Sequence, residues 1–598
     1  MKKRSIRSRW AFRLCALSLL TLNSAVGLAK PAAQQIAGEA PYQLTTQDGT
    51  GLQLTQLEAK TVVDGPFAFT ELHLRFKNPH PRQIEGRFQV IMPERAVISR
   101  MAMQINGAWM EGEVVEKQAA RRAYEDALHR RQDPALLEQD SGNRFRARIF
   151  PINANEEKAL IISWSQTLSG RQPAYQLPLR GLPEIAELKL SAQVRSGVGG
   201  LQSNLGGEGS LYQTLRVNRQ DYTPTQDWVI SAQPVPAKGD GFRAEELTTA
   251  RLVIPESQLD RERFEHAVIF FDSSASRMIG FEERLKQLAD LIDGLAVQGV
   301  ESLRVIPFDQ QAGEVIEGAP EAIKPRMLET LRARGALGAS KFEVAIEALA
   351  GAARWSKSRL ILLSDGAFNL GAQELGALQK AAAQLAQLGV ERVDAIVDTS
   401  ARDAAKLEAL VRLNGLRPGR VIEGKSPVEA QLKRLGQRTL PEIKLSVEGA
   451  EWSWPETVAG AQPGDTVTLF AELPSDAQLK VSLSGGVEAS FSPETRAAPR
   501  PLLERSWVRA RIESLEAARA GVNRDLREAF KSQIVRLSTR HRVLSRYTAL
   551  VVLERESDYE RFKIDRRALA DILVVGAQGV ELQQRSAQAL GASWARRD

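Results

Sequence analysis

An apolar run that ends in an acid and several small hydroxyl residues does most to limit what this chain can fold into. The run is AVIFF, residues 267–271, and DSSAS, residues 272–276, follows it directly. A short run rich in Val, Ile and Phe is typical of a strand buried in a parallel sheet. In open α/β sheets, ligands bind just beyond the carboxyl ends of such strands. A carboxylate and hydroxyls at that position suit a hard cation such as Mg²⁺ or Mn²⁺, although Asp and Ser are also common in simple turns.

A second apolar run ends in the same way. Residues 360–363, LILL, have the character of another buried strand and lead into SDG, with Asp365 at its centre. Between the two runs, Ser340 stands just before a stretch of helical character. These segments, in this order over residues 264–424, resemble the von Willebrand factor type A (vWA) domain and its metal-ion-dependent adhesion site.

The family pattern is Asp-x-Ser-x-Ser, then a threonine, then an aspartate. Asp272, Ser274 and Ser276 match the first part, Asp365 matches the last, and Ser340 stands in place of the threonine. The resemblance implies that the three serine hydroxyls contact Mg²⁺ or Mn²⁺ directly and that the two aspartates act directly or through water. It also implies that an Asp or Glu of a protein partner completes the coordination shell. Since Ser340 departs from the pattern, a retained fold with a silent site is the alternative.

In the rest of this region, which we place at residues 262–428, short apolar runs typical of strands alternate with stretches of helical spacing. Such alternation predicts a doubly wound, Rossmann-like domain with a mostly parallel sheet and helices on both faces. Strands are expected at 302–308, 359–363 and 392–397, with an edge strand at 420–422. Helices are expected at 283–295, 325–333, 342–353, 374–388 and 404–413, with Pro325 in a first turn.

Residues 41–170 carry a different set of patterns. Apolar and polar residues alternate over 70–77, which predicts a half-buried strand, and residues 112–131 have helical spacing. The motifs FKN (76–78), GEVVEK (112–117), YEDA (124–127) and LLE (136–138), followed by a strand at 145–152, resemble the vault protein inter-alpha-trypsin (VIT) domain.

A VIT domain directly upstream of a vWA domain is the arrangement of inter-alpha-trypsin inhibitor heavy chains and of many bacterial relatives. The resemblance implies a β-rich VIT fold without known catalysis, so we expect Phe76 and Tyr124 to be core residues. The remaining segments complete a multidomain α/β and β chain. They are a β-rich connector at 171–255, a β-sandwich-like region at 438–495, and a helical and mixed C-terminal region at 500–598.

The formal net charge of +7 does not indicate nucleic-acid binding. Six basic residues lie within the first 29 positions, which hold no acid: Lys2, Lys3, Arg4, Arg7, Arg9 and Arg13. Without them the net charge is about +1, which is too small for a general nucleic-acid footprint.

The same basic residues form the start of a secretory signal. An apolar stretch from Leu14 to about Leu22 follows, and small residues up to Ala29 suit a cleavage site. A membrane anchor is the alternative, but the stretch is short for a bilayer span. The only cysteine, Cys15, lies within this segment, which excludes disulfides from the cleaved chain. We therefore expect an exported protein, periplasmic or secreted, cleaved after about Ala29, with possible envelope association.

The sequence thus predicts a non-enzymatic adhesion or interaction protein that binds an acidic group of a protein partner through its metal. The alternative is an envelope structural or assembly factor with a vestigial metal site. A Mg²⁺-dependent hydrolase is a third possibility, but neither Gly-x-Ser-x-Gly nor His-Glu-x-x-His occurs, and the five histidines are scattered. His266 is expected to be a packed strand residue. Asp309 is expected to be a solvated acid at a strand end, and a place behind the metal ligands is the alternative.

Overall fold

A computed structural model of the chain describes most of residues 40–583. The residues outside the description are 1–39, 131, 133, 196–202, 207–211, 257–260, 520, 565–570 and 584–598. The predicted signal segment, residues 1–29, therefore lies outside the described residues. Within the described ranges, no helix is both long enough and apolar enough to span a membrane.

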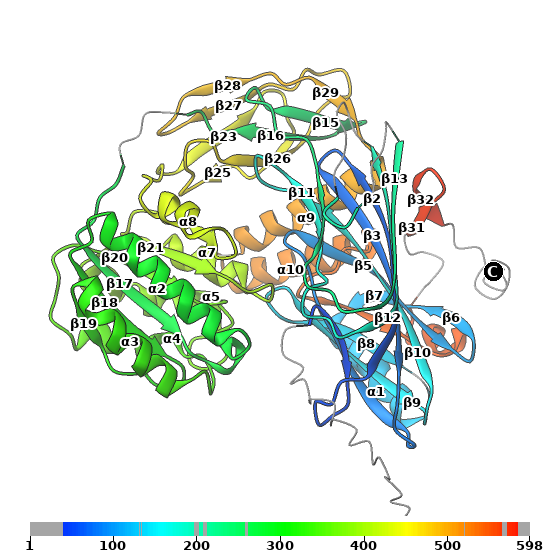
Figure 1. Cartoon of the computed structure of the whole chain (residues 1–598). Coiled ribbons are helices and arrows are strands. Elements are labelled where there is room, and N and C mark those ends of the chain that lie inside the picture. The colour runs from blue at the N-terminus through cyan, green and yellow to red at the C-terminus, as the bar shows by residue number, and fades with distance from the viewer. Residues whose placement is uncertain are drawn as a thin grey trace, which may run out of the picture. The chain divides into compact units, whose positions relative to one another are not determined.

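The N-terminal part is built from two sheets (Figure 1). A seven-stranded sheet has the order β13-β12-β2-β3-β10-β5-β6, and a six-stranded sheet has the order β1-β4-β9-β8-β30-β7. One large apolar core is drawn from both. The strands of the first sheet are β2 (Gln53–Asp64), β3 (Phe67–Lys77), β5 (Ala96–Ile105), β6 (Ala108–Glu111), β10 (Glu157–Thr167), β12 (Ile185–Arg195) and β13 (Tyr212–Tyr222). Those of the second are β1 (Tyr42–Thr45), β4 (Ile84–Ile91), β7 (Glu113–Glu116), β8 (Ala135–Ser141), β9 (Arg144–Ile152) and β30 (Thr548–Val552).

The strand β30 comes from the far end of the chain and completes the second sheet. It pairs antiparallel with β7 on one side and with β8 on the other. Leu550 of β30 lies opposite Val114 in one pair and opposite Leu137 in the other. The short apolar run of β30 therefore belongs to the core of the N-terminal part.

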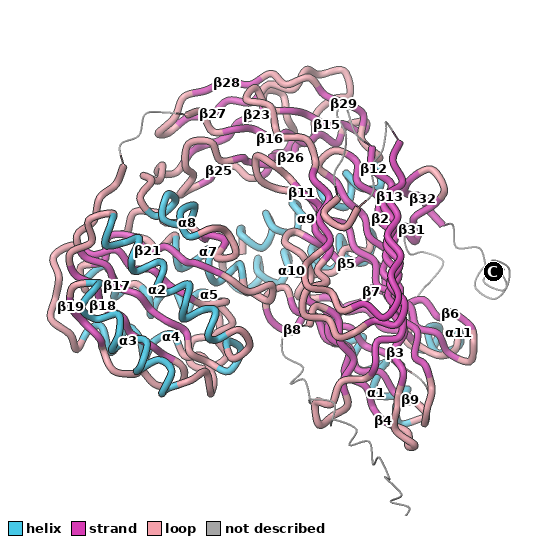
Figure 2. Tube along the Cα trace, viewed as in Figure 1, coloured by secondary structure: helices cyan, strands magenta, loops and turns pink. Residues whose placement is uncertain are grey.

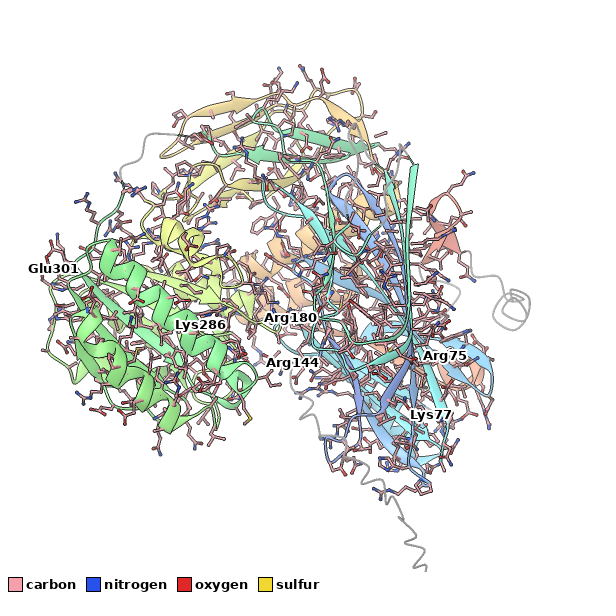
Figure 3. The ribbon with its side chains drawn as sticks, viewed as in Figure 1. Arg75, Lys77, Arg144, Arg180, Lys286 and Glu301 are labelled. Carbon is pink, nitrogen blue, oxygen red and sulfur yellow. The ribbon has the colours of Figure 1, made fainter. Side chains whose placement is uncertain are left out.

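Two predictions for this part are wrong in detail. The helix expected over residues 112–131 is the strand β7 followed by helix α1 (Lys117–His129), because residues 113–116 pair with β30. The strand over 70–77 alternates as predicted from Leu72 to Lys77, but Glu71 is buried, because both faces are covered from Phe67 to Leu72. Only its end emerges, where Arg75 and Lys77 are exposed (Figure 3).

The covering on the outer face of β3 comes from the C-terminal helix α9 (Arg500–Ala518). Phe67 and Phe69 share an apolar cluster with Leu502 and Leu503. Helix α9 also contacts β10, and helix α10 (Arg524–His541) packs beside α9. The two helices and β30 thus all belong with the N-terminal sheets.

The vWA-like region holds a six-stranded sheet with the order β19-β18-β17-β20-β21-β22 (Figure 2). Five strands are parallel, and β19 pairs antiparallel at one edge. The strands are β17 (His266–Asp272), β18 (Ser302–Phe308), β19 (Ile316–Gly318), β20 (Ser358–Leu363), β21 (Val390–Val397) and β22 (Val421–Glu423). The expected parallel sheet and its edge strand are present, with boundaries shifted by one or two residues.

Helices cover both faces of this sheet. Alternate residues of β17 point to opposite sides: Val268 and Phe270 belong to one apolar cluster, whereas Ala267 and Ile269 belong to another. The first cluster includes helices α4 (Phe342–Ala350), α5 (Leu375–Ala382), α6 (Gln384–Gln387) and α7 (Ala404–Val411). The second includes α2 (Phe281–Val297), α3 (Pro320–Arg334) and α8 (Val428–Leu435).

The prediction of a helix that begins at Pro325 is wrong. Helix α3 begins at Pro320, which occupies the first helical position, and Pro325 lies inside it. The first position tolerates proline because its missing N–H would have no partner there.

Two further sheets share an apolar core of their own. The five-stranded sheet has the order β24-β26-β16-β15-β29, and the four-stranded sheet has the order β25-β23-β27-β28. The strands are β15 (Asp240–Ala244), β16 (Leu247–Val253), β23 (Ile443–Val447), β24 (Trp452–Trp454), β25 (Thr457–Val458), β26 (Thr466–Glu472), β27 (Val481–Ser484), β28 (Ala489–Phe491) and β29 (Thr495–Ala497). Two small pairs, β11 (Ala174–Leu177) with β14 (Trp228–Ser231) and β31 (Ile572–Gly576) with β32 (Gly579–Gln583), and helix α11 (Glu556–Arg561) complete the described elements.

Candidate metal site at the carboxyl ends of the parallel strands

The two aspartates singled out in the sequence lie next to each other at one edge of the parallel sheet. β17 ends at Asp272, and β20 ends at Leu363, two residues before Asp365. The register pairs Phe271 with Leu363, so the residues that follow both strands leave the sheet together. Asp272 is 1% exposed and Asp365 is 2% exposed. The sheet therefore places two carboxylates side by side with almost no access to water.

Hydroxyl groups from two other segments meet the carboxylate of Asp272. Ser340 Oγ donates to Asp272 Oδ2 at 3.1 Å, and Ser364 Oγ donates to the same oxygen at 2.6 Å. The other oxygen, Oδ1, accepts a hydrogen bond from the backbone N–H of Ser274 at 3.0 Å. Asp272 is thus the centre to which all three site loops connect.

The remaining two serines lie on the first loop. Ser274 precedes and Ser276 lies within a short 3₁₀ turn, and their Oγ atoms are 3.2 Å apart. The second aspartate is fixed by its own loop, since the N–H of Ala367 donates to Asp365 Oδ1 at 2.9 Å. All five residues predicted as metal ligands are therefore carried by three neighbouring loops.

Burial raises the pKa of Asp272, and the nearby negative charge of Asp365 raises it further. The Arg277 guanidinium opposes this shift. A pair of buried carboxylates with like charges is unfavourable unless a cation lies close to them. The electrostatics of the site therefore favour a bound cation.

Arg277 belongs to a buried ion-pair cluster behind the first loop. Its Nη2 donates to Asp398 Oδ1 at 2.5 Å, and Arg284 Nε donates to Asp398 Oδ2 at 2.9 Å. Arg284 also donates to the backbone carbonyl of Arg277. This cluster fixes the start of helix α2 and the Ser276 loop to the end of β21.

Sequence reasoning missed two residues of the site. Ser364 contacts Asp272 more closely than Ser340 does, and Asn369 accepts a hydrogen bond from the N–H of Ser340 at 2.8 Å through its side chain. The position of Ser364, directly after a buried strand, was a usable signal. The contact of Asn369 depends on how the loop after Asp365 folds back, and no local pattern predicts that.

Exposed apolar side chains occur on or close to the loops that carry the site. Eight large hydrophobic side chains are exposed in the described ranges, and five of them lie on or beside the three site loops. We call these five the apolar collar: Met278 (40% exposed), Ile279 (39%), Leu337 (62%), Leu370 (40%) and Leu375 (40%).

Backbone hydrogen bonds hold the loops of the collar together. The N–H of Leu337 donates to Ser273 O at 2.9 Å, and the N–H of Leu370 donates to Ser340 O at 3.1 Å. Leu337 and Leu370 are therefore anchored to the same loops that carry the predicted metal ligands. Clustered exposed apolar side chains are typical of a surface that binds a protein.

The donor set fits a hard divalent cation. No group of three or more His, Cys, Asp or Glu side chains that could hold a metal occurs in the part of the chain that the structure describes. The candidate ligands are instead two carboxylates and three hydroxyls, and oxygen donors of this kind suit Mg²⁺ and Mn²⁺.

Other residues singled out in the sequence have structural roles. Phe76 and Tyr124 are 1% and 3% exposed and belong to apolar cores, as predicted. His266 stacks on Trp355 with ring centroids 5.0 Å apart, as expected of a packed strand residue. Asp309 pairs with Arg334 at 2.6 Å instead of being a free solvated acid.

The family model for the vault protein inter-alpha-trypsin (VIT) domain matches residues 54–163. The human inter-alpha-trypsin inhibitor heavy chain H6 is 26% identical over 192 residues, which are 31% of this chain and 14% of the human protein. The human heavy chain H4 is 25% identical over 146 residues, which are 24% of this chain and 16% of the human protein. The chain thus aligns with less than a fifth of each relative, and its predicted resemblance to this group is confirmed.

Solved structures, a vWA protein among them, are also similar to parts of the chain. The match to the ArnB paralog VWA2 from Sulfolobus acidocaldarius covers 55% of this chain and 90% of that protein's chain, with 13% sequence identity and a TM-score of 0.24. The match to the proximal thread matrix protein 1 of the mussel byssus covers 32% of this chain and 51% of that protein's chain, with 18% sequence identity and a TM-score of 0.25.

Proposed function

We propose that this chain is an exported, non-enzymatic binding protein that captures an acidic side chain of a protein partner through a divalent metal in its vWA-like region. The observation that carries the proposal is the meeting of two buried carboxylates and several hydroxyls at the carboxyl ends of β17 and β20. The doubly wound character of residues 262–428 and the sandwich-like character of 438–495 are part of the same proposal.

In this proposal Mg²⁺ or Mn²⁺ is held by the hydroxyls of Ser274, Ser276 and Ser340, with Asp272 and Asp365 as the charged groups. When bound, the metal supplies an electrophilic centre that accepts a further oxygen ligand. Because three of the five protein ligands are neutral hydroxyls, the cation keeps an open position and stays electrophilic. An incoming Asp or Glu can fill that position, and an apolar surface beside that acid can pack on the collar.

Binding is favoured over catalysis by the contacts of the site hydroxyls. Ser274 contacts Ser276, and both Ser340 and Ser364 contact Asp272. Among the described residues, none of these four hydroxyls has a hydrogen bond to a histidine that would make it a nucleophile. The VIT relatives named above support the same class of function.

One observation favours the second candidate, an envelope structural or assembly factor with a vestigial metal site. Ser340 and Ser364 already satisfy Asp272 Oδ2 from within the protein. In that case the N-terminal sheets and the C-terminal helices perform the function, and the site loops are held by their own hydrogen bonds.

Metal titration separates the two candidates. We expect Mn²⁺ to bind the full chain with one site in isothermal titration calorimetry and to raise its unfolding temperature relative to EDTA. A metal present at about 100 times its Kd adds about 2.7 kcal/mol of stability. The variant Asp272→Ala should lose both effects, whereas Asp290→Ala, an exposed acid on α2, should keep them. Equal heats and equal unfolding temperatures for the chain and Asp272→Ala would support the vestigial site.

A further inference from the structure

A two-residue turn of the N-terminal part reaches the vWA-like region. Gly142 and Asn143 join β8 to β9 and lie among the residues that match the VIT family model. Gly142 has a φ of +55°, and a Cβ added to it would collide with the carbonyl oxygen of Arg402. The turn therefore approaches the backbone at residue 402 so closely that position 142 requires a glycine. Arg144, the residue after the turn, is labelled in Figure 3.

Asn143 forms hydrogen bonds with three backbone groups of the vWA-like region. Its side-chain oxygen accepts from the N–H of Arg402 at 2.8 Å, and its own N–H donates to the carbonyl of Arg402 at 3.1 Å. Its Nδ2 donates to the carbonyl of Ser400 at 2.8 Å and to that of Met92, just after β4, at 2.7 Å. Asn143 thus fixes the backbone of residues 400–402 to the end of an N-terminal strand.

The next residue in the chain, Asp403, contacts the loop of a predicted metal ligand. The N–H of Asp403 donates to the backbone carbonyl of Asp365 at 2.8 Å. Gly366, with a φ of +75°, packs against the same place, since a Cβ added to it would lie 3.0 Å from the carbonyl oxygen of Asp403. The N–H of Ala367 holds Asp365 Oδ1 at 2.9 Å. A shift of residue 403 would therefore move the loop that fixes the Asp365 carboxylate.

The opposite end of the same stretch is bonded to the first site loop. Asp398 Oδ1 accepts a hydrogen bond from Arg277 Nη2 at 2.5 Å, and Arg277 directly follows the predicted ligand Ser276. We call residues 398–403 the joint segment. Its two ends contact the loops that carry Ser276 and Asp365, and its middle contacts the turn at Asn143.

The contacts that the joint segment makes within the vWA-like region involve other groups. Lys425 Nζ donates to Ser400 Oγ at 2.9 Å, and the side chain of Arg402 pairs with Glu423 at 2.9 Å. The hydrogen bonds to the carbonyl of Ser400 and to both backbone groups of Arg402 come instead from Asn143. Without Asn143 these three backbone groups would need water as their partner, and the backbone of the joint segment would lose its fixed position.

We propose that Asn143 is a positioning residue for the metal site and couples that site to the docking of the N-terminal part. By holding the joint segment, it keeps Asp403 bonded to the loop of Asp365. Outer contacts of this kind keep ligands in the geometry that a metal needs. Because coupling between two events is reciprocal, bound metal strengthens the docking of the turn by the same factor. The metal consequence rests on the proposed function, whereas the positioning of Asp365 does not.

Hydrogen exchange in EDTA tests the positioning on the full chain, independently of metal. Asn143→Ala loses the side-chain bonds to Ser400 and Arg402. We expect the protected amides of residues 364–368 and 400–404 to exchange about tenfold faster in this variant, as measured by mass spectrometry of peptides. Gly142→Ala, which pushes the turn away from Arg402 and keeps Asn143, should have the same effect. Unchanged exchange at 364–368 in both variants would overturn the proposal, whether or not the chain binds metal.

Titration calorimetry with Mn²⁺ tests the consequence for the metal. We expect a Kd about tenfold weaker for Asn143→Ala than for the unchanged chain. In the unchanged chain, Mn²⁺ should slow exchange at residues 400–404. Equal Kd values in the two chains would overturn the coupling. If the unchanged chain bound no Mn²⁺, the proposed function would fail, and the exchange at 364–368 would still decide the role of Asn143.

Two control variants separate this role from a general loss of stability. Asn204 makes a similar clamp in the connector, where its side chain accepts from the N–H of Val229 and donates to the carbonyl of Asp227, both at 2.8 Å. Asn204→Ala should lower the unfolding temperature and keep the Kd for Mn²⁺ and the exchange at 364–368. Glu94→Ala removes only a 3.5 Å pair with the Arg402 side chain and should also keep both. An equal loss of Mn²⁺ affinity in Asn204→Ala would overturn the proposal.

Discussion

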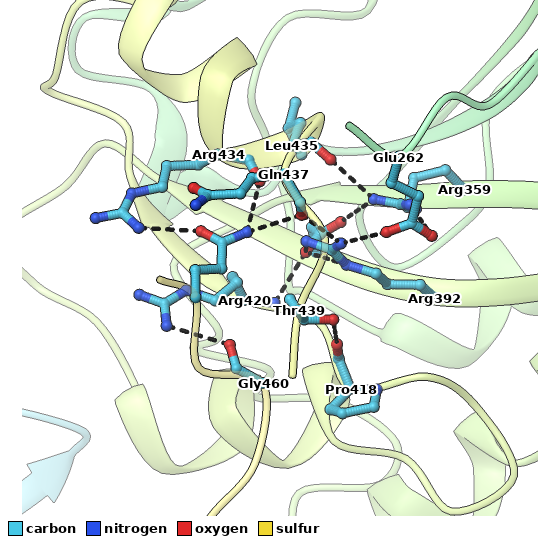
Figure 4. A network of polar contacts seen from close by, with 12 residues as sticks. Glu262, Arg359, Arg392, Pro418, Arg420, Arg434, Leu435, Gln437, Thr439 and Gly460 are labelled. Atoms are coloured by element: carbon cyan, nitrogen blue, oxygen red, sulfur yellow. Dashed lines mark hydrogen bonds and ion pairs between the residues drawn. The ribbon is translucent and has the colours of Figure 1, made fainter. Parts of the chain in front are cut away.

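Arg392 and Asp394 lie two residues apart on β21 and form an ion pair at 2.8 Å in which neither side chain has any exposed surface. Asp394 also pairs with Arg359 at 3.0 Å, and Glu262 bridges the two arginines at 2.9 Å to each (Figure 4). Burial lowers the pKa of Arg392, and the charge of Asp394 opposes that shift. Two arginines and two acids thus balance one another inside the vWA-like region.

Removing Asp394 should therefore destabilise this region severely. Asp394→Ala leaves two buried guanidinium groups with one acid, and breaking such a pair typically costs about 3–5 kcal/mol. Urea unfolding followed by tryptophan fluorescence measures the loss. Arg417→Ala is the control, because Arg417 is 51% exposed and pairs with Glu262 from the rim, so its removal should cost about 1 kcal/mol or less. Equal losses for the two variants would contradict the cluster's role.

The stability of the chain should depend on Asp398 in acid. Burial alone would raise the pKa of Asp398, but the charges of Arg277 and Arg284 more than offset it and hold the pKa below the usual 3.8. Because the folded pKa is depressed, the contribution of Asp398 is present above the usual value and is lost as the pH falls through the folded pKa.

Asp398→Asn should accordingly be less stable at neutral pH and show a shallower loss of stability below pH 3.8. Thermal unfolding across pH 2 to 7 measures both effects. Asp290→Asn, on the exposed face of α2, should follow the unchanged chain. If Asp398→Asn had the same unfolding temperature as the unchanged chain at every pH, the contacts of Asp398 with Arg277 and Arg284 would not stabilise the folded state.

The apolar collar should affect binding but not folding. Leu337 is 62% exposed, so Leu337→Ser should change the free energy of unfolding by no more than about 0.5 kcal/mol. A partner captured in an Asp272-dependent manner should bind this variant at least tenfold more weakly, as measured by surface plasmon resonance with Mg²⁺. The matched variant is Val297→Ser, which is 89% exposed at the end of α2 and outside the collar. Unchanged affinity of Leu337→Ser would assign the collar no part in binding.

The pairing of β30 should decide the stability of the N-terminal sheets. Leu550 is fully buried between β7 and β8, and Leu550→Ala should cost about 2–5 kcal/mol. Hydrogen exchange should then accelerate at the amides of β7 and β8, although both strands are unaltered in sequence. Leu526→Ala, at a position 47% exposed on α10, should leave exchange unchanged. Protection of β7 and β8 that survives the change at 550 would show that these strands hold without β30.

Local sequence patterns were sufficient to predict the strands of the vWA-like region, because these strands are buried on both faces and helices follow them closely in the sequence. Ser302–Phe308 was predicted to the residue, and β17 and β20 brought Asp272 and Asp365 together as expected. The bond from Ser364 to Asp272 was not predicted, because two side chains 92 residues apart meet only once the register of the strands is known.

The N-terminal sheets show where local patterns fail. Glu71 alternates with apolar neighbours and suggested a solvent-facing position, yet it is 6% exposed and pairs with Arg100 at 2.9 Å. The face that carries Glu71 is covered by elements from the other end of the chain, and alternation within one strand cannot report them. Residues 113–116 pair with β30, which is equally far away in the sequence. For that reason a helix was predicted where the structure has β7.

The place of β30 also sets the order in which the protein can be completed during synthesis. Tyr559 Oη donates to the carbonyl of Glu111, 448 residues earlier, beside the strand pair formed by β7 and β30. A ribosome that has finished residues 40–222 has therefore produced a sheet that still lacks an inner strand. The edges of β7 and β8 that pair with β30 keep unpaired backbone groups until the vWA-like region, the two C-terminal helices and β30 itself have been synthesised. A chain interrupted between residues 141 and 548 thus carries two strand edges that lack their partner.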